Sequence, residues 1–166
     1  TRKKRRIIGR MYEGLGAFVQ VSVEKKVVGQ SKFSQLLKQV NQYVTVASDL
    51  AVTATYTAFP YSIGTLDPAP ASNTVTYANN NVTVEVAPSN AITADDHDEL
   101  YLIEFNKDSG VSKVYATGQN RPTSAPLTIT YTPLTTGAGT RYVYVVYVSA
   151  NQTKSSNTTC VGSYQI

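Results

Sequence analysis

The sequence predicts a mainly β protein, an immunoglobulin-like β-sandwich with a basic N-terminal arm and one short helix. Tyr, Val and Thr fill most of the apolar runs, with Tyr alone occurring 12 times, and these side chains favour pleated, half-buried strands. Strand signals follow one another closely after position 73 without helical patterns between them, which is typical of a sandwich. A chain of 166 residues is long enough for one domain with an arm.

Charge is divided unevenly along the chain. Only 16% of the residues are charged, against about 25% in an average soluble domain. Residues 1–40 carry ten Lys or Arg and two acids, a net charge of +8, whereas residues 41–166 carry five and nine, a net charge of −4. The basic part can therefore dock on the acidic part of a neighbouring copy, or on a polyanion such as nucleic acid.

The first ten residues contain six cations, and a run of this kind is normally a flexible tail. Because cations this dense repel one another, we expect opposite charge from another subunit, from nucleic acid or from the chain's own acidic part to hold them. No aromatic residue lies among them to stack on bases, so nucleic acid would be held through phosphates. If these side chains lie free in water, the case for an assembly role is lost. The predicted interaction residues are Arg2, Lys3, Lys4, Arg5, Arg6 and Arg10.

Residues 1–58 are predicted to form an anchoring segment of arm, strand and helix. Alternating valines predict a strand over residues 17–24. Apolar residues that recur three and four positions apart predict a helix over residues 33–44, with Ser31 as its N-cap. A Val, Thr and Tyr run predicts a further strand over residues 51–57.

Residues 59–73 contain three prolines and are predicted to be a linker without a regular strand. The sandwich is predicted over residues 74–166, with an Asn-rich hairpin turn after its first strand. The strand over residues 142–149 is apolar on both faces, which predicts that the opposed sheet covers one face and the N-terminal helix or a partner the other. The predicted strands are Thr74–Tyr77, Val82–Ala87, Leu100–Asn106, Val111–Thr117, Leu127–Thr132, Tyr142–Ser149 and a last one near Ser156–Gly162.

A series of motifs occupies the second half of the chain, namely Phe105-Asn106-Lys107, Tyr142-Val143-Tyr144-Val145, Val148-Ser149-Ala150-Asn151-Gln152 and Ser155-Ser156-Asn157. These motifs resemble the end of an uncharacterised family from gut Bacteroidetes and their phages. The resemblance covers about residues 50–165. It implies a helical N-terminal part joined to an immunoglobulin-like sandwich, and it implies no activity. The basic arm replaces the Gly-rich opening of that family, so the resemblance says nothing about residues 1–30.

The densest acidic cluster is a candidate receptor for a neighbour's basic arm, or a candidate cation loop. It consists of Asp95, Asp96, Asp98 and Glu99 around His97. A calcium site needs six to eight oxygen ligands, and the cluster lacks the Gly and distal Glu of an EF-hand loop. A solvated acidic loop is therefore favoured, and we predict neither a metal nor a cofactor.

No catalytic residues are predicted. His97 is the single histidine and has no nucleophile at a recognisable spacing, and Cys160 lies in a predicted strand, where we expect an inert thiol. A phosphate-binding Gly loop, an HExxH motif and a CxxC motif are all absent from the sequence. No apolar run is long enough to span a bilayer. We therefore expect a non-enzymatic protein that does not cross a membrane.

The leading hypothesis is a virion structural protein, a phage capsid-associated or decoration protein whose basic arm anchors it to neighbouring subunits. The expected partners are other copies or other virion proteins in an oligomer or larger assembly, with nucleic acid as an alternative contact of the arm. One alternative is a β-sandwich binding module of the bacterial surface or periplasm. Another is a small-virus coat protein with a jelly-roll sandwich and a genome-contacting arm.

Overall fold

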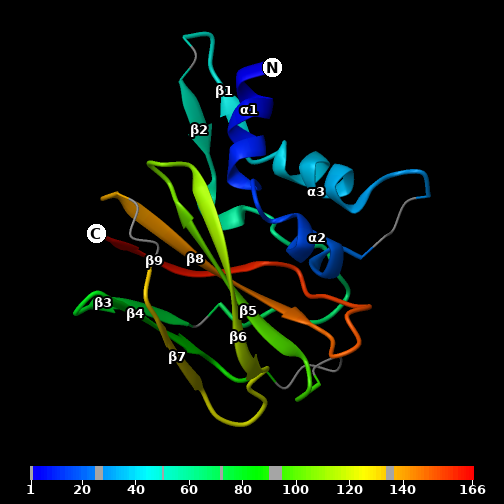
Figure 1. Cartoon of the computed structure of the whole chain (residues 1–166), viewed down its shortest axis with the longest axis vertical. Coiled ribbons are helices and arrows are strands. Elements are labelled where there is room, and N and C mark those ends of the chain that lie inside the picture. The colour runs from blue at the N-terminus through cyan, green and yellow to red at the C-terminus, as the bar shows by residue number, and fades with distance from the viewer. Residues whose placement is uncertain (1, 25–27, 50, 72, 90–94, 134–136) are drawn as a thin grey trace.

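Two antiparallel sheets packed together form the body of the molecule, and three helices lie over the outer face of the larger sheet (Figure 1). The computed structural model describes residues 2–24, 28–49, 51–71, 73–89, 95–133 and 137–166. The prediction of a mainly β protein is confirmed.

The seven strands of the body divide into a three-stranded and a four-stranded sheet. The smaller sheet has the order β3-β4-β7 and the larger one the order β6-β5-β8-β9, and all neighbours are antiparallel. The strands are β3 Thr74–Ala78, β4 Asn81–Val86, β5 Glu99–Asn106, β6 Val111–Asn120, β7 Leu127–Tyr131, β8 Thr140–Val148 and β9 Thr159–Gln165.

Local turn chemistry fixes the two hairpins as the sequence predicts. Asn79 and Asn80 have φ angles of 51° and 61°, which is the left-handed backbone of the two-residue turn that suits a twisted hairpin. Between β5 and β6, the Asn106 side chain accepts hydrogen bonds from the backbone nitrogens of Asp108 (2.9 Å) and Ser109 (3.1 Å). Both turns therefore set the register of the strands that they join.

Strand β8 is buried on both faces, which confirms the prediction made from its apolar sequence. Val143 and Val145 point into the core between the two sheets, where they meet Val84 of β4. Tyr144 and Val146 belong to a second core, which the helices share with the outer face of the larger sheet. The helices thus supply the second cover that a central strand of this kind needs.

Helix α3, Lys32–Val40, begins where the sequence predicts. The Ser31 side chain accepts a hydrogen bond from the Ser34 backbone nitrogen at 3.0 Å, so the predicted N-cap is confirmed. Leu36 and Val40 are buried against the helix-side core. The helix ends four residues before the predicted limit, because the chain turns at Asn41 to enter strand β1, Val44–Val46.

The predicted strand over residues 17–24 is wrong, because this segment forms helix α2, Gly16–Ser22. Leu15, Phe18, Val19 and Ser22 follow one another at three- and four-residue spacings, and the structure buries them on one side of the helix. The segment is therefore helical because its tertiary contacts outweigh the strand preference of its alternating valines. Only Val23 pairs as in a sheet, through a parallel bridge to Ile63.

Three further boundaries differ from the prediction. The basic arm is helix α1, Arg2–Met11, so the described chain contains three helices where one was expected. The predicted strand over residues 51–57 is strand β2, Val52–Ala54, followed by the 3-10 helix η1, Tyr56–Ala58. The last strand begins at Thr159 rather than near Ser156, because Ser155 and Ser156 form isolated bridges to other segments instead.

The Pro-containing segment 59–73 forms no strand in its described part, yet much of it is buried. Phe59, Tyr61 and Ile63 have at most 4% of their surface exposed and lie in the helix-side core. The Thr158 hydroxyl accepts hydrogen bonds from the backbone nitrogens of Tyr61 (2.8 Å) and Ser62 (3.0 Å). The segment therefore satisfies its backbone through side chains and isolated bridges while it packs the helices onto the sheet.

Candidate polyanion-binding site

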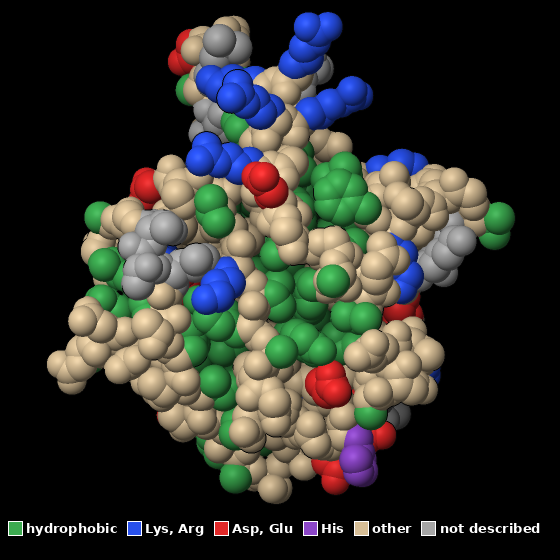
Figure 2. Space-filling view, viewed as in Figure 1, with side chains coloured by type: hydrophobic (Ala, Val, Ile, Leu, Met, Phe, Trp, Pro, Cys, Tyr) green, Lys and Arg blue, Asp and Glu red, His purple; other side chains and the backbone are tan. Residues whose placement is uncertain are grey.

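Helix α1 is strongly amphipathic. Ile8 and Met11 are buried, with 3% and 1% of their surface exposed, and they lie in the helix-side core. A ten-residue helix is not stable alone in water, so this packing holds the arm in place. The exposed side carries the cations, and Figure 2 shows Lys and Arg side chains gathered over α1 at one end of the molecule. Its exposed cations are Arg2, Lys3, Arg5, Arg6 and Arg10.

Lys4 has a different role from its neighbours on α1. Its ammonium group donates a hydrogen bond to the backbone oxygen of Asn41 at 2.6 Å. Asn41 is the residue at which α3 ends, and a cation at the C-terminus of a helix is favourable because the carbonyl groups there carry partial negative charge. Lys4 thus joins α1 to α3, and it leaves the other five predicted arm residues on the exposed side.

The exposed cations of α1 are crowded. Arg2, Arg6 and Arg10 follow one another at four-residue spacing, and like charges at this spacing destabilise a helix. The first turn contains no acidic residue, so cations also occupy the helix end where the macrodipole favours anions. The charge pattern of α1 therefore opposes the helical state that its apolar side imposes.

No carboxylate within the described residues forms an ion pair with the guanidinium groups of Arg2, Arg5, Arg6 and Arg10. The burial of Ile8 and Met11 accounts for the ordered position of the arm, so the expectation that opposite charge holds it stays a prediction. The ordered arm therefore does not by itself require a partner, and the opposite charge on which the assembly role depends has to come from another molecule. The charge of these four guanidinium groups is the feature of α1 that no ion pair among the described residues accounts for.

The predicted acidic receptor lies at the end of the molecule away from α1 (Figure 2). Only Asp95 and Asp96 are exposed and available. Asp98 is buried and pairs with the equally buried Arg121 at 3.0 Å, and the Arg121 guanidinium lies 3.9 Å from the centre of the Tyr147 ring. Glu99 is half-buried and accepts a hydrogen bond from Tyr101 at 2.9 Å. The structure thus divides the four predicted acids between a surface pair and internal contacts.

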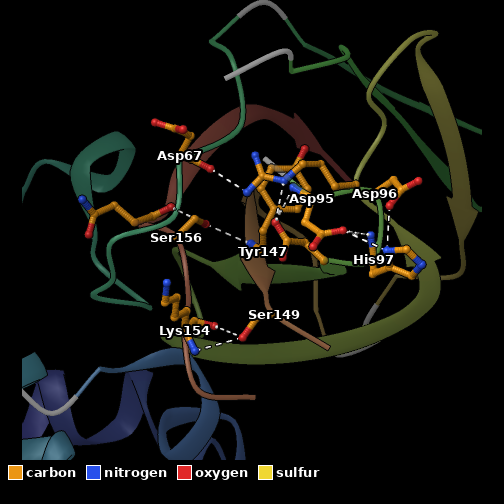
Figure 3. Close-up of polar contacts among 11 residues, drawn as sticks. Asp67, Asp95, Asp96, His97, Tyr147, Ser149, Lys154 and Ser156 are labelled. Atoms are coloured by element: carbon orange, nitrogen blue, oxygen red, sulfur yellow. Dashed lines mark hydrogen bonds and ion pairs between the residues drawn. The ribbon is translucent and has the colours of Figure 1, made fainter. Parts of the chain in front are cut away.

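The exposed acids form a small cluster with His97 (Figure 3). The His97 Nδ1 atom lies 2.9 Å from Asp95 Oδ1 and 2.7 Å from Asp96 Oδ1. The candidate ligand atoms of the three side chains lie within 4.8 Å of one another. Three exposed ligands are too few for a calcium site, and their pairing with one another accounts for the arrangement, so we assign no metal to them.

His97 gives a pH-dependent prediction. The hydrogen bond that His97 donates to Asp95 and the charge of Asp96 raise the pKa of His97, while the contacts with His97 lower the pKa of Asp95. Since the folded-state pKa of His97 is raised, the small stabilisation of this loop is present in mildly acidic solution and is lost as the pH rises through that pKa. We expect Asp95→Asn to lower the His97 pKa, as measured by NMR titration of the single imidazole; an unchanged pKa would contradict the contact.

Cys160 on β9 is a free, half-buried thiol. Burial raises the pKa of this thiol, which disfavours the thiolate that a nucleophile needs.

None of the helices in the described part of the chain is long and apolar enough to span a bilayer.

No protein-family model, curated protein or solved structure matches this chain. Its function must therefore be inferred from its own residues.

The sequence analysis predicted the cations of the arm but not its helix. The spacing of Ile7, Ile8 and Met11 contains the three- and four-residue period that predicts a helix.

Proposed function

We propose that this chain is a non-enzymatic structural protein of a larger assembly. The resemblance to a family from gut Bacteroidetes and their phages favours a virion as that assembly. The cationic side of α1 anchors the protein to an acidic surface of neighbouring subunits. The observation that supports this proposal is a crowded cationic surface in which Arg2, Arg5, Arg6 and Arg10 form no ion pair with a carboxylate among the described residues, on a helix whose apolar side lies in the core. An anionic partner would offset the repulsion within α1 and the unfavourable helix-end charge.

We further propose that the body is an immunoglobulin-like sandwich. Numbered along the chain from β3, the seven strands have the orders 1-2-5 and 4-3-6-7. An immunoglobulin constant domain has the orders 1-2-5-4 and 3-6-7. The two arrangements differ only in the sheet that the fourth strand joins. A jelly roll has eight strands in two Greek keys, so the division seen here favours the immunoglobulin-like interpretation over that of a jelly-roll coat protein.

The test of the anchoring role is a comparison of two triple variants. Arg2→Gln/Arg6→Gln/Arg10→Gln removes three charges from the exposed side of α1. Each exposed ion pair contributes about 0.5 kcal/mol, so we expect the variant to bind poly-L-glutamate about tenfold more weakly than the wild type at low salt. Fluorescence anisotropy of the labelled polymer measures the affinity, and circular dichroism checks that the variant is folded.

The control variant removes the same net charge elsewhere. Lys107→Gln/Lys113→Gln/Lys154→Gln changes three exposed cations outside α1, and we expect its affinity to stay within about twofold of the wild type. Equal losses in the two variants would mean that poly-L-glutamate responds to net charge alone, and the anchoring role of α1 would then be wrong. A parallel titration with duplex DNA measures the affinity for nucleic acid; a clear preference for DNA would favour phosphate contacts over a protein partner.

A further inference from the structure

A shallow groove of about 380 Å³ separates α1 from α3. The half-buried Leu37 supplies apolar surface within it and the almost fully buried Ile8 also borders it, while the exposed Arg5 and Lys38 add cationic ends. Apolar atoms, including those of the Arg5 and Lys38 side chains, make up most of its exposed lining surface. The groove therefore combines two properties, an apolar surface between two helices and positive charge on each helix.

Gly9 lies in this groove, and nothing in the chain's own packing requires a glycine there. A Cβ atom added at Gly9 would meet no atom within 4 Å, and the φ angle of Gly9 is not positive. Glycine inside a helix is less favourable than alanine. Gly9 directly follows Ile7 and Ile8, the apolar residues of α1. The chain's own packing thus gives no reason for a glycine at position 9. The close passage of another chain over the α1 backbone at this point would give one.

We propose that the α1–α3 groove receives an acidic segment of a partner subunit that carries an apolar side chain. This inference rests on the proposed function, and it adds the chemistry of the partner. The apolar side chain lies on the half-buried Leu37, carboxylates beside it pair with Arg5 and Lys38, and the backbone of the segment crosses Gly9. A phosphate backbone would satisfy the cations but would leave the apolar surface of Leu37 uncovered, so the lining favours a protein segment over nucleic acid.

The test uses two short acidic peptides that differ at one position, a leucine in the first and a serine in the second. We expect the wild-type chain to bind the leucine peptide about tenfold more tightly, because the leucine leaves water when it enters the groove. Gly9→Leu fills the groove with the chain's own side chain and should remove this preference. Because leucine is a better helix former than glycine, the melting temperature of Gly9→Leu should equal or exceed that of the wild type, so a loss of binding cannot be ascribed to unfolding.

Gly16→Leu is the matched control, since Gly16 also has open space around it and lies at the start of α2, outside the groove. This variant should keep the preference for the leucine peptide. Equal binding of the two peptides to the wild type, or a preference that survives Gly9→Leu, would overturn the groove inference. If the triple Arg variant still weakens poly-L-glutamate binding in that case, the anchoring role of α1 stands; if it does not, both proposals are wrong.

Discussion

Arg141→Met is expected to destabilise the protein by about 3–5 kcal/mol, the range observed when one partner of a buried ion pair is removed. The Arg141 side chain has no exposed surface, and its Nη1 atom donates to Glu104 Oε1 at 2.7 Å. Its Nη2 atom donates to the Gly137 backbone oxygen at 2.8 Å. Without Arg141, the fully buried Glu104 retains the hydrogen bond from Tyr164 at 2.7 Å but lacks a countercharge in the core.

Urea unfolding measures this effect, with the double variant Arg141→Met/Glu104→Gln as the control. The double variant removes the charge that the single variant leaves behind, so it should recover about 1–3 kcal/mol of the loss. If the single variant loses less than about 1 kcal/mol, or if the double variant is no more stable than the single one, Glu104 is not the stranded charge and this account of the core is wrong.

Gly64→Ala is expected to destabilise the protein by about 3 kcal/mol, at the upper end of the range for overpacking. A Cβ atom at Gly64 would overlap the backbone carbonyl group of Ser155. Ser155 cannot shift easily, because its hydroxyl donates to the Ser22 backbone oxygen at 2.8 Å and its backbone nitrogen donates to Glu24 at 2.9 Å. Leu66 adds a third contact through its backbone nitrogen, which donates to the Ser155 oxygen at 2.9 Å.

These contacts join the end of α2 to the β8–β9 connection, so the substitution strains the attachment of the helices to the sheet. Chemical unfolding measures the loss of stability. The control is Gly16→Ala, which makes the same chemical change at a position where an added Cβ atom has open space. We expect the control to be neutral or slightly stabilising. A Gly64→Ala variant as stable as the Gly16→Ala variant would show that the contact with Ser155 is not as close as described.

The parts of the fold that the sequence predicted are those governed by neighbouring residues. Asn79 and Asn80 favour the left-handed backbone of a hairpin turn wherever they lie, and Ser31 caps a helix through a nitrogen three residues away. The two apolar faces of β8 likewise predicted cover on both sides. In each case the deciding interaction spans a few residues, or a pattern along a single strand, so no knowledge of the tertiary structure was needed.

Other parts depended on contacts that the sequence does not display. Residues 17–24 fit both a strand and a helical period, and the helix-side core decided between them. Asp98 was predicted as a surface receptor because its neighbours are acidic, whereas its buried partner Arg121 lies 23 residues away. The six cations of the arm were recognisable, but only the folded chain shows that Lys4 is engaged by α3 and that Gly9 lies in open space.

The central claim is that the exposed side of α1 binds an acidic partner. An NMR titration of the isotope-labelled chain with poly-L-glutamate at low salt tests it most directly. The account predicts that the amide signals of Arg2–Met11 shift together and reverse when salt is added, while the signals of the two sheets stay in place. Shifts centred on Lys107, Lys113 or Lys154 instead, or no shifts at all, would contradict it.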